Sequence, residues 1–237
     1  MSKTVDKAQC VIAVDIGGTR LRAASVTEYG EIRHLKQRKT LPRRYVQAII
    51  SDINGLIEEQ ERYSHERGFT VRGIGIISPG YPDVDGRVSI TPNIPCLTNV
   101  PIKNYLKKDP AVPVLFENDG NAGAYGEYIF GQKKKVRHLV VLTLGTGLGS
   151  GVVADGKIAR GTEGVSGELG HVTLNPDGPQ CLCGKSGCLE SYFSGFALVQ
   201  SAKTLLKDSR HLVGYKNNIE AITPETIAEK ARGGDRI

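Results

Sequence analysis

The chain has 237 residues, 39% hydrophobic and 24% charged, with a formal net charge of +6. This length allows one large domain or two small lobes with a buried core, and the composition is typical of a soluble globular protein. The first ten residues lack the apolar centre of a signal peptide, and no apolar run approaches the length of a membrane span. We therefore expect no membrane partner.

The first half of the chain predicts a strand-rich unit. Apolar residues at helical spacing, with charges on the opposite face, predict a helix over residues 45–67. Residues 78–113 are rich in proline and turn residues, so we expect a connection with ligand-facing loops there. Short apolar runs bounded by turn residues predict strands over residues 11–14, 21–26, 32–38, 71–77 and 114–117.

The second half begins with a predicted helix over residues 120–130, which Asn118 or Asp119 could cap. Lys133–Lys135 and Arg137 form the compact basic run of the chain. No aromatic residues alternate with them, so we interpret them as a solvated loop and expect no nucleic-acid partner. Further patterns predict a strand, a hairpin about Asp155-Gly156 and three helices, over residues 139–144, 151–160, 189–194, 196–206 and 223–232.

One internal repeat organises these elements. The segments VIAVDIGGT (11–19) and VVLTLGTGL (140–148) both run from a buried strand into a Gly/Thr turn and then into a second strand. Two related lobes, each with a phosphate-facing hairpin, produce such a pattern. We therefore predict an α/β protein of two lobes, over residues 1–118 and 119–237.

The first glycine turn has the chemistry of an anion site. Gly17 and Gly18 allow several backbone N–H groups to turn toward one anion, and Thr19 adds a hydroxyl donor. Asp15 would repel a phosphate directly, but it can hold Mg²⁺, through water if needed. The second turn would supply N–H donors from the opposite lobe, at Gly145, Thr146 and Gly147. Either turn alone also suits a purely structural role.

The segment FENDGNAG (116–123) places Asn118 and Asp119 between the end of a strand and the start of a helix. A carboxylate at this position can accept the proton of a substrate hydroxyl as that hydroxyl attacks phosphorus, which typically contributes about 10²–10⁴ in rate. The alternative role of Asp119 is a helix N-cap without chemistry.

Further polar residues suit a polyol ligand. Carboxylates and a neutral imidazole accept hydrogen bonds from sugar hydroxyls, and Glu168, His171 and Glu190 supply these groups. Asn93 lies in a proline-rich loop, TPNIP, that could reach the same site. The alternative for the two glutamates is an exposed surface position.

Four residues offer the ligands of a closed tetrahedral zinc site: one imidazole and three thiols. Cys181 and Cys183 are separated by one residue, a spacing that strains a disulfide, and Gly184 and Gly187 allow the chain to fold back. If His171 binds the metal through one ring nitrogen, the other is oriented toward the sugar. A metal-binding cluster also favours a reducing cytoplasm over an oxidising compartment. The ligands are His171, Cys181, Cys183 and Cys188.

The motifs DIGGT, ENDGNA, LGTGLGSG, ELGH and CLCGKSGCLE, in this order, resemble the ROK family of sugar kinases and sugar-responsive repressors. The resemblance covers residues 11–235. It implies a two-lobed actin/hexokinase-like (ribonuclease H-like) ATPase fold, with Asp119 as catalytic base and the DIGGT and Gly145–Gly147 turns facing ATP. The implied hexose-site residues are Gly80, Asn93, Asn118, Glu168, His171 and Glu190; the implied zinc ligands are the four residues named above.

Two departures from the family pattern sharpen the prediction. ROK repressors carry a helix-turn-helix domain before the DIGGT strand, whereas ten residues precede Val11 here, which favours a kinase. ROK kinases usually continue beyond the point where this sequence stops, so we expect an incomplete second lobe. Stretches such as PGYPD resemble the glucokinase branch, which favours phosphorylation of glucose at the 6-OH.

The expected cofactors are structural Zn²⁺ and Mg²⁺ with ATP, in a cytoplasmic protein that forms a homo-oligomer, most simply a dimer. N-acetylmannosamine, N-acetylglucosamine, fructose and allose are alternative substrates. A sugar sensor without catalysis is the alternative function. A zinc module that binds nucleic acid is disfavoured, because the cysteines lie beside acidic residues.

Overall fold

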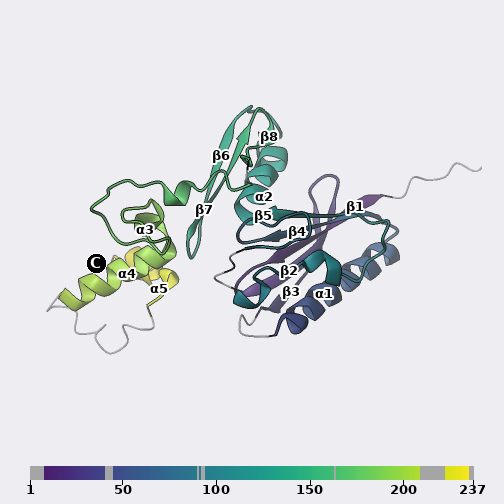
Figure 1. Cartoon of the computed structure of the whole chain (residues 1–237), viewed down its shortest axis with the longest axis horizontal. Coiled ribbons are helices and arrows are strands. Elements are labelled where there is room, and N and C mark those ends of the chain that lie inside the picture. The colour runs from purple at the N-terminus through teal and green to yellow at the C-terminus, as the bar shows by residue number, and fades with distance from the viewer. Residues whose placement is uncertain are drawn as a thin grey trace, which may run out of the picture.

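The structure is a computed structural model that describes residues 8–40, 45–89, 91, 94–162, 164–208 and 222–234. Its larger sheet lies beside a long helix on the right of Figure 1, and the C-terminal helices lie on the left. The predicted strands of the first half are present and slightly longer than expected. Their bounds are β1 Gln9–Ile16, β2 Arg20–Thr27, β3 Ile32–Lys39, β4 Thr70–Ser78 and β5 Val114–Asn118.

The order of strands in the larger sheet is β3-β2-β1-β4-β5. The first three strands form an antiparallel meander, whereas β4 runs parallel to β1, and β5 parallel to β4. The register pairs Asp15 with Ile77 and Ser78 with Asn118. Because the carboxyl ends of parallel strands meet at one edge of a sheet, the loops that follow β1, β4 and β5 meet there.

The predicted long helix is α1, Val46–Glu66. Its apolar residues recur at three- and four-residue spacing and pack on the sheet, where Ile49, Ile53 and Ile57 have no exposed surface. Each such side chain contributes about 1.5–3 kcal/mol of transfer free energy when fully buried. On the sheet side, the same core contains Ile12, Val14, Ile16, Leu21, Ile74 and Ile76.

The smaller sheet has the order β6-β7-β8 (Figure 1), with bounds β6 Leu139–Leu144, β7 Leu148–Ala154 and β8 Lys157–Ile158. The hairpin predicted at Asp155-Gly156 is confirmed: both residues have positive φ, at 49° and 75°, as a type I′ turn requires. Helix α2, Asp119–Gly126, continues into a π turn, Glu127–Gly131.

Helix α2 lies against β7 with its backbone almost in contact. A Cβ atom on Gly120 would lie 2.3 Å from the carbonyl oxygen of Ser150, and a Cβ on Gly151 would lie 2.3 Å from that of Gly120. Only glycine fits at either position, because a side chain would force the helix away from the strand. This close packing places the start of α2 beside the smaller sheet.

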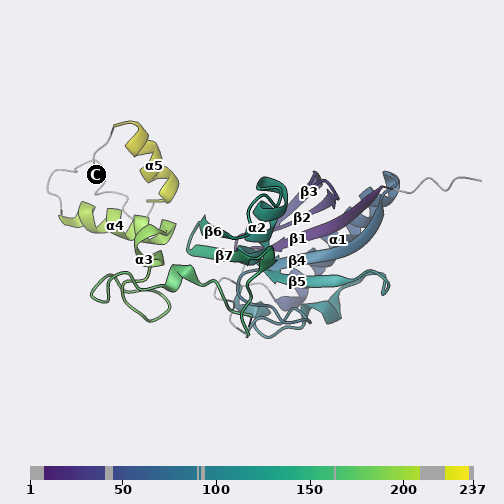
Figure 2. The same cartoon turned by 90° about the horizontal axis from the view of Figure 1, so that it is seen from above.

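Three helices follow a loop-rich segment: α3 Glu190–Phe193, α4 Gly195–Asp208 and α5 Pro224–Arg232. They match the three predicted helices, and Figure 2 shows them together at the end of the molecule away from β1. Within the described residues, no helix combines the length and hydrophobicity needed to cross a membrane. Short 3₁₀ helices occur at Pro95–Leu97, Ile102–Tyr105 and Leu169–His171.

Candidate functional site

The carboxyl edge of the larger sheet brings together three segments that the sequence separates widely. Asp15 lies near the end of β1, Gly80 in the loop after β4, and Asn118 at the end of β5. The Asn118 amide donates to the Gly80 carbonyl at 2.8 Å, and its Oδ1 accepts from the N–H of Asn121 at 3.0 Å. Asn118 is therefore the N-cap of α2, and it fixes the loop after β4 beside the start of that helix.

Asp119 is the first residue of α2, and its side chain reaches solvent. Its Oδ1 accepts hydrogen bonds from the Gly120 N–H at 2.9 Å and from the Asn118 amide at 3.2 Å. Desolvation by the surrounding protein raises the pKa of Asp119, and the nearby charges of Asp15 and Glu168 raise it further. Two carboxylates from other segments thus act on Asp119, which favours a base of raised proton affinity.

Asp15 also has a raised pKa, chiefly because burial removes water from its carboxylate. The Arg22 guanidinium, with its Nε 3.7 Å from Asp15 Oδ2, opposes that shift. A partly desolvated carboxylate near a second one is a poor neighbour for a phosphate unless a cation lies between them. The arrangement therefore fits the predicted role of Asp15 in holding Mg²⁺.

Glu168 comes from the loop before the 3₁₀ turn Leu169–His171, and Tyr81, which is not among the predicted site residues, holds its side chain. The Tyr81 hydroxyl donates to Glu168 Oε1 at 2.5 Å, and Glu168 Oε2 lies 3.7 Å from His171 Nε2. Desolvation, the hydrogen bond to Glu168 and the charges of Glu168 and Asp119 raise the pKa of Tyr81. The available sequence signal was the position of Tyr81, directly after Gly80.

The loop that carries Glu168 is anchored at two further points. The Nε and Nη2 groups of Arg160 both donate to Glu117 Oε2 on β5, and such charge-assisted hydrogen bonds are stronger than neutral ones. The Ser150 hydroxyl donates to the Gly167 carbonyl and accepts from the Leu169 N–H. The loop that carries Glu168 is therefore held close to the end of β5, although the two are distant in sequence.

The first glycine turn is closed by a hydrogen bond from the Gly17 N–H to the Arg20 carbonyl at 3.0 Å. The Thr40 hydroxyl donates to the Gly17 carbonyl at 2.6 Å, and the Thr40 N–H donates to the Thr19 carbonyl at 3.0 Å. Among the described residues, the N–H groups of Gly18 and Thr19 have no backbone partner. The carbonyls are thus engaged while two N–H groups remain, as an anion-binding turn requires.

The second glycine turn is braced in a similar way by residues of α3 and α4. The N–H groups of Gly195 and Phe196 donate to the carbonyls of Gly145 and Thr146, at 2.8 and 3.1 Å. Glu190 Oε2 accepts from the Leu148 N–H at 2.8 Å. The N–H groups of Thr146 and Gly147 likewise lack a backbone partner in the described part of the chain.

Glu190 also faces the cysteine cluster, where Cys181 Sγ lies 3.8 Å from its Oε1. Its observed contacts are therefore with the second turn and the cluster. Its predicted contact with a hexose stays a prediction. Asn93, predicted for the same site, lies outside the described residues.

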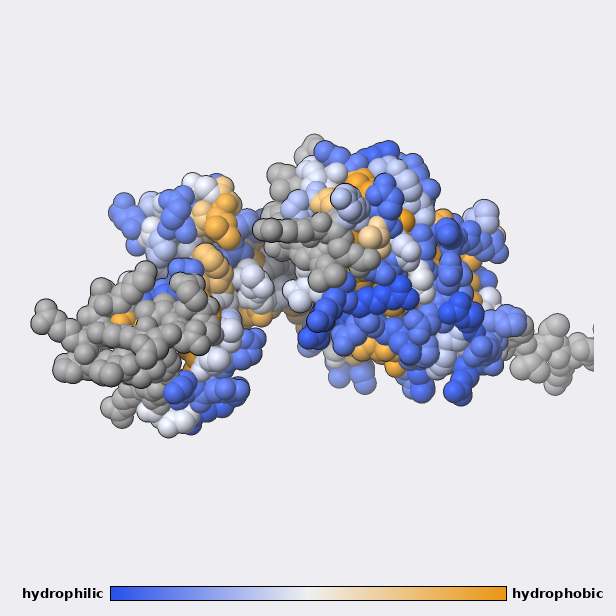
Figure 3. All heavy atoms as spheres, turned by 90° about the horizontal axis from the view of Figure 1, so that it is seen from below, coloured by the Kyte–Doolittle hydropathy of each residue, from blue (hydrophilic) through white to orange (hydrophobic). Residues whose placement is uncertain are grey.

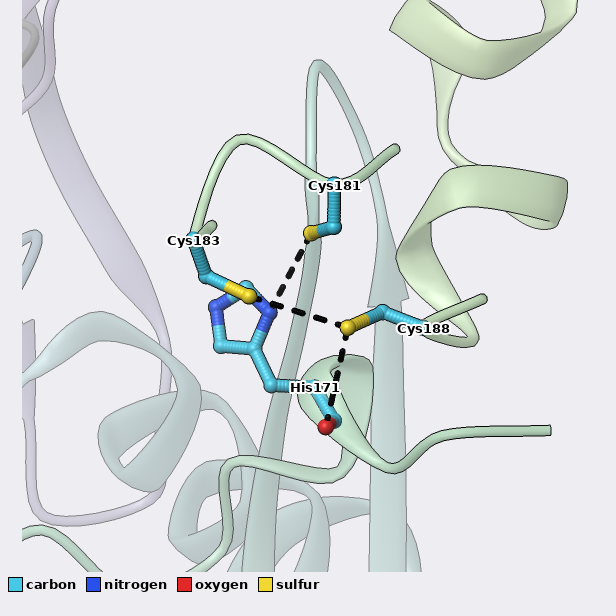
Figure 4. A group of neighbouring side chains, drawn as sticks. All are labelled: His171, Cys181, Cys183 and Cys188. Atoms are coloured by element: carbon cyan, nitrogen blue, oxygen red, sulfur yellow. Dashed lines mark hydrogen bonds between the residues drawn. The ribbon is translucent and has the colours of Figure 1, made fainter. Parts of the chain in front are cut away.

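The four predicted metal ligands converge, although His171 and the first cysteine are ten positions apart in the sequence. Their ligand atoms all lie within 4.8 Å of one another, and Figure 4 shows the side chains directed at a common centre. His171 Nδ1 lies 3.7 Å from Cys181 Sγ, and the sulfurs of Cys183 and Cys188 are 3.6 Å apart. A tetrahedral ion with a Zn–S distance of about 2.3 Å separates its sulfurs by about 3.8 Å, so this donor set fits zinc.

The backbone brings these ligands together through short turns. Thr173 pairs with Cys188 in an isolated bridge, and the Cys181 N–H donates to the Lys185 carbonyl at 2.8 Å. Gly187 has φ 68°, and a Cβ there would lie 1.5 Å from the Asn175 carbonyl oxygen. Because only glycine can occupy that position, Gly187 directs Cys188 back toward His171.

Comparison with known proteins identifies relatives along nearly the whole chain. The ROK family pattern matches residues 11–237. Glucokinase from Streptomyces coelicolor is 42% identical over 195 residues, which cover 81% of this chain and 58% of that protein. Glucokinase from Thermotoga maritima is 37% identical over 230 residues, 96% of this chain and 71% of that protein.

The same region is shared with proteins of other function. A xylose repressor from Caldicellulosiruptor bescii is 37% identical over 77% of this chain and 46% of the repressor.

Among solved structures, a ROK glucokinase from Streptomyces griseus in complex with glucose and AMPPNP aligns with a TM-score of 0.76 and 36% identity, over 95% of this chain and 72% of that one. The predicted hexokinase-like α/β fold is thereby confirmed, and the chain belongs to the ROK family.

Proposed function

We propose that this chain takes part in ATP-dependent phosphorylation of a hexose, with glucose as the preferred substrate and its 6-OH as the acceptor. The observation that carries the proposal is the convergence of three acidic residues at one edge of the larger sheet: Asp15 lies near the end of β1, Asp119 directly after β5, and Glu168 is bound by Tyr81 of the loop after β4. Similarity to two glucokinases supports the choice of glucose. Asp119 would supply the base, and Glu168 would accept a hydrogen bond from a sugar hydroxyl. The two glycine turns would supply N–H donors for the phosphates.

In the proposed reaction, the hexose lies between Asp119 and Glu168. Asp119 accepts the proton of the 6-OH while the oxygen forms a bond to the γ-phosphorus of ATP. The bond from that phosphorus to the bridging oxygen breaks, and ADP leaves with the electron pair. A base of raised proton affinity suits this step, because it accepts the proton more readily as the bond to phosphorus forms.

The remaining residues position ATP and stabilise charge. The N–H groups of Gly18, Thr19, Thr146 and Gly147 would face its phosphates, where fixed donors stabilise the transition state without reorganisation. Asp15 would hold Mg²⁺, which when bound neutralises phosphate charge. Structural zinc would be held by His171 and the three cysteines, with His171 Nδ1 toward the metal and Nε2 toward Glu168 and the sugar.

The direct test is release of ADP from MgATP by the purified chain, with and without glucose. We expect glucose-dependent turnover, and Asp119→Asn should reduce it by about 10²–10⁴-fold. N-acetylmannosamine, N-acetylglucosamine, fructose and allose serve as competing substrates that define the specificity. Near-native turnover by Asp119→Asn would remove the base assignment.

A second candidate, a sugar sensor without catalysis, is favoured by the similarity to the xylose repressor. Calorimetry separates the two functions. Glucose or xylose binding without ATP binding or ADP release supports the sensor, whereas binding of both sugar and nucleotide followed by turnover supports the kinase.

A further inference from the structure

We infer that Tyr81 is a positioning residue of the sugar site: its hydroxyl holds Glu168 in the orientation that accepts a hydrogen bond from the hexose. The inference rests on the proposed function, because it concerns the same site. Tyr81 is the tyrosine of the segment SPGYPD (78–83). The proline and glycine residues of this segment predicted a ligand-facing loop, but they gave no role to the tyrosine.

The two oxygens of Glu168 have different surroundings. Oε1 accepts the hydrogen bond from Tyr81, and Oε2 lies 3.7 Å from His171 Nε2. The Glu168 side chain is 46% exposed, so a flexible glutamate at this position would otherwise sample several rotamers. The phenol selects one of them and leaves Oε2 free for a sugar hydroxyl beside the His171 ring.

Tyr81 itself is well placed to act as a fixed support. Its backbone follows Gly80, whose carbonyl is held by the Asn118 amide at 2.8 Å. A phenol has few rotatable bonds and loses little entropy when it holds a partner. The tie therefore connects the segment after β4 to the segment before His171, across 87 residues of sequence.

The hydroxyl also lies near the base. Tyr81 contacts Glu168, and the preceding residue, Gly80, is bound by Asn118, the neighbour of Asp119, so Tyr81 borders the region where the proposed hexose would lie. Tyr81 donates a hydrogen bond to Glu168 and exchanges no proton in the proposed reaction. A change in Tyr81 should consequently alter sugar binding far more than the chemical step or nucleotide binding.

Tyr81→Phe tests the inference, because it removes one oxygen and keeps the ring. Calorimetric titration with glucose should give a Kd about 5- to 20-fold weaker than that of the unaltered chain, as expected for a hydrogen bond to a partly exposed charged group. The Kd for MgATP and the Tm should stay within experimental error. Tyr29→Phe is the matched control, because the Tyr29 side chain is 79% exposed, and it should leave both Kd values unchanged.

A double-mutant cycle with Glu168→Ala distinguishes positioning from direct contact with the sugar. If Tyr81 acts through Glu168, Tyr81→Phe should add less than about a 2-fold loss of glucose affinity in the Glu168→Ala background. A full additional loss there would overturn the inference, and so would glucose binding that Tyr81→Phe leaves unaltered. Failure of the unaltered chain to bind any hexose contradicts the proposed function together with this inference, whereas binding without turnover contradicts the kinase proposal alone.

Discussion

The two sheets of the molecule differ sharply in how well their own residues cover them. The larger sheet packs its apolar side chains against α1, and Ile12, Ile53 and Ile76 are almost fully buried. The smaller sheet has a modest core of Ala124, Tyr128 and Val153 with partly buried neighbours. Its strand β6 leaves Val140, Leu142 and Leu144 exposed by 55%, 47% and 70%.

The difference also appears at the surface. Figure 3 shows a continuous hydrophobic strip on the part of the molecule at the left, whereas hydrophobic atoms on the part at the right are scattered among hydrophilic ones. Phe193 of α3 and Phe196 and Leu198 of α4 are exposed, and they line a groove that begins at the second glycine turn. The larger sheet with α1 is therefore stabilised mainly by its apolar core, whereas the region from β6 to α5 depends more on turns, backbone contacts and the cysteine cluster.

Metal removal should produce the largest difference between the two regions. A bound structural zinc contributes about 10–16 kcal/mol of apparent binding free energy in small zinc peptides, so its loss should release the segment from His171 to Cys188 while α1 stays folded. Hydrogen exchange before and after chelation measures this contrast. We expect about one zinc per chain, lost in Cys183→Ser.

Cys96→Ser is the control for that experiment, because Cys96 is a partly buried cysteine outside the cluster. It should retain the metal and the protection from exchange. Equal protection of residues 171–188 with and without chelator would show that the cluster does not depend on an ion.

Truncation of an apolar side chain should lower the free energy of unfolding by several kcal/mol more in the larger sheet's core than in the smaller sheet. Ile53→Ala removes a fully buried side chain and should lower the free energy of unfolding by about 2–5 kcal/mol. Leu142→Ala, on the exposed face of β6, should change it by less than about 1 kcal/mol. Urea denaturation of both variants measures the contrast, and equal losses would mean that β6 is covered in solution.

Gly151→Ala probes the contact that joins the smaller sheet to α2. The added methyl group would meet the Gly120 carbonyl, and overpacking of this kind costs about 1–3 kcal/mol. Because α2 begins at Asp119, we expect glucose-dependent turnover to fall together with stability. Gly123→Ala is the control, since a Cβ there meets nothing within 4 Å. Unaltered turnover in Gly151→Ala would show that the reaction does not depend on the close packing of α2 against β7.

Asp119→Asn should have the smallest effect on stability. Unlike the preceding substitutions, it should stabilise the fold. The folded state raises the pKa of Asp119. Protonated Asp119 therefore contributes to the free energy of unfolding below the unfolded-state pKa of about 3.9. This contribution is lost as pH rises through the higher folded-state pKa. At pH 7 the charged carboxylate therefore costs stability, and the variant should have a slightly higher Tm.

That gain should shrink as the pH approaches 4, which thermal unfolding at several pH values can check. In the unaltered chain, kcat/KM should fall as pH decreases through the raised pKa, because the base becomes protonated. A lower Tm of Asp119→Asn at pH 7 would contradict the assigned direction of the shift.

Much of the fold could be predicted from periodicity and turn chemistry. The strand-Gly/Thr-strand repeat predicted both glycine hairpins, and Asp155-Gly156 predicted the turn between β7 and β8. The division into lobes at Asp119 stays a prediction, although β5 ends and α2 begins there. Periodicity gave no sign that helix 120–130 ends in a π turn, because that depends on hydrogen bonding within the helix.

The candidate site was only partly predictable. Residue types and spacing suffice to propose a zinc cluster, since three thiols in eight residues restrict the options. The Tyr81–Glu168 hydrogen bond joins residues 87 positions apart, and no local pattern encodes such a contact. The hydrogen bond from Leu148 to Glu190 is similar: the sequence indicates an acidic residue, but only the fold indicates which donor it meets.

Strand β6 has a consequence for handling the protein. Among the described residues it pairs with β7 alone, so its other backbone edge offers unpaired N–H and C=O groups next to exposed valine and leucine side chains. An edge of this kind is a template for strands of other molecules. We therefore expect the apparent molar mass from light scattering to rise with protein concentration, and Leu142→Lys to reduce this rise.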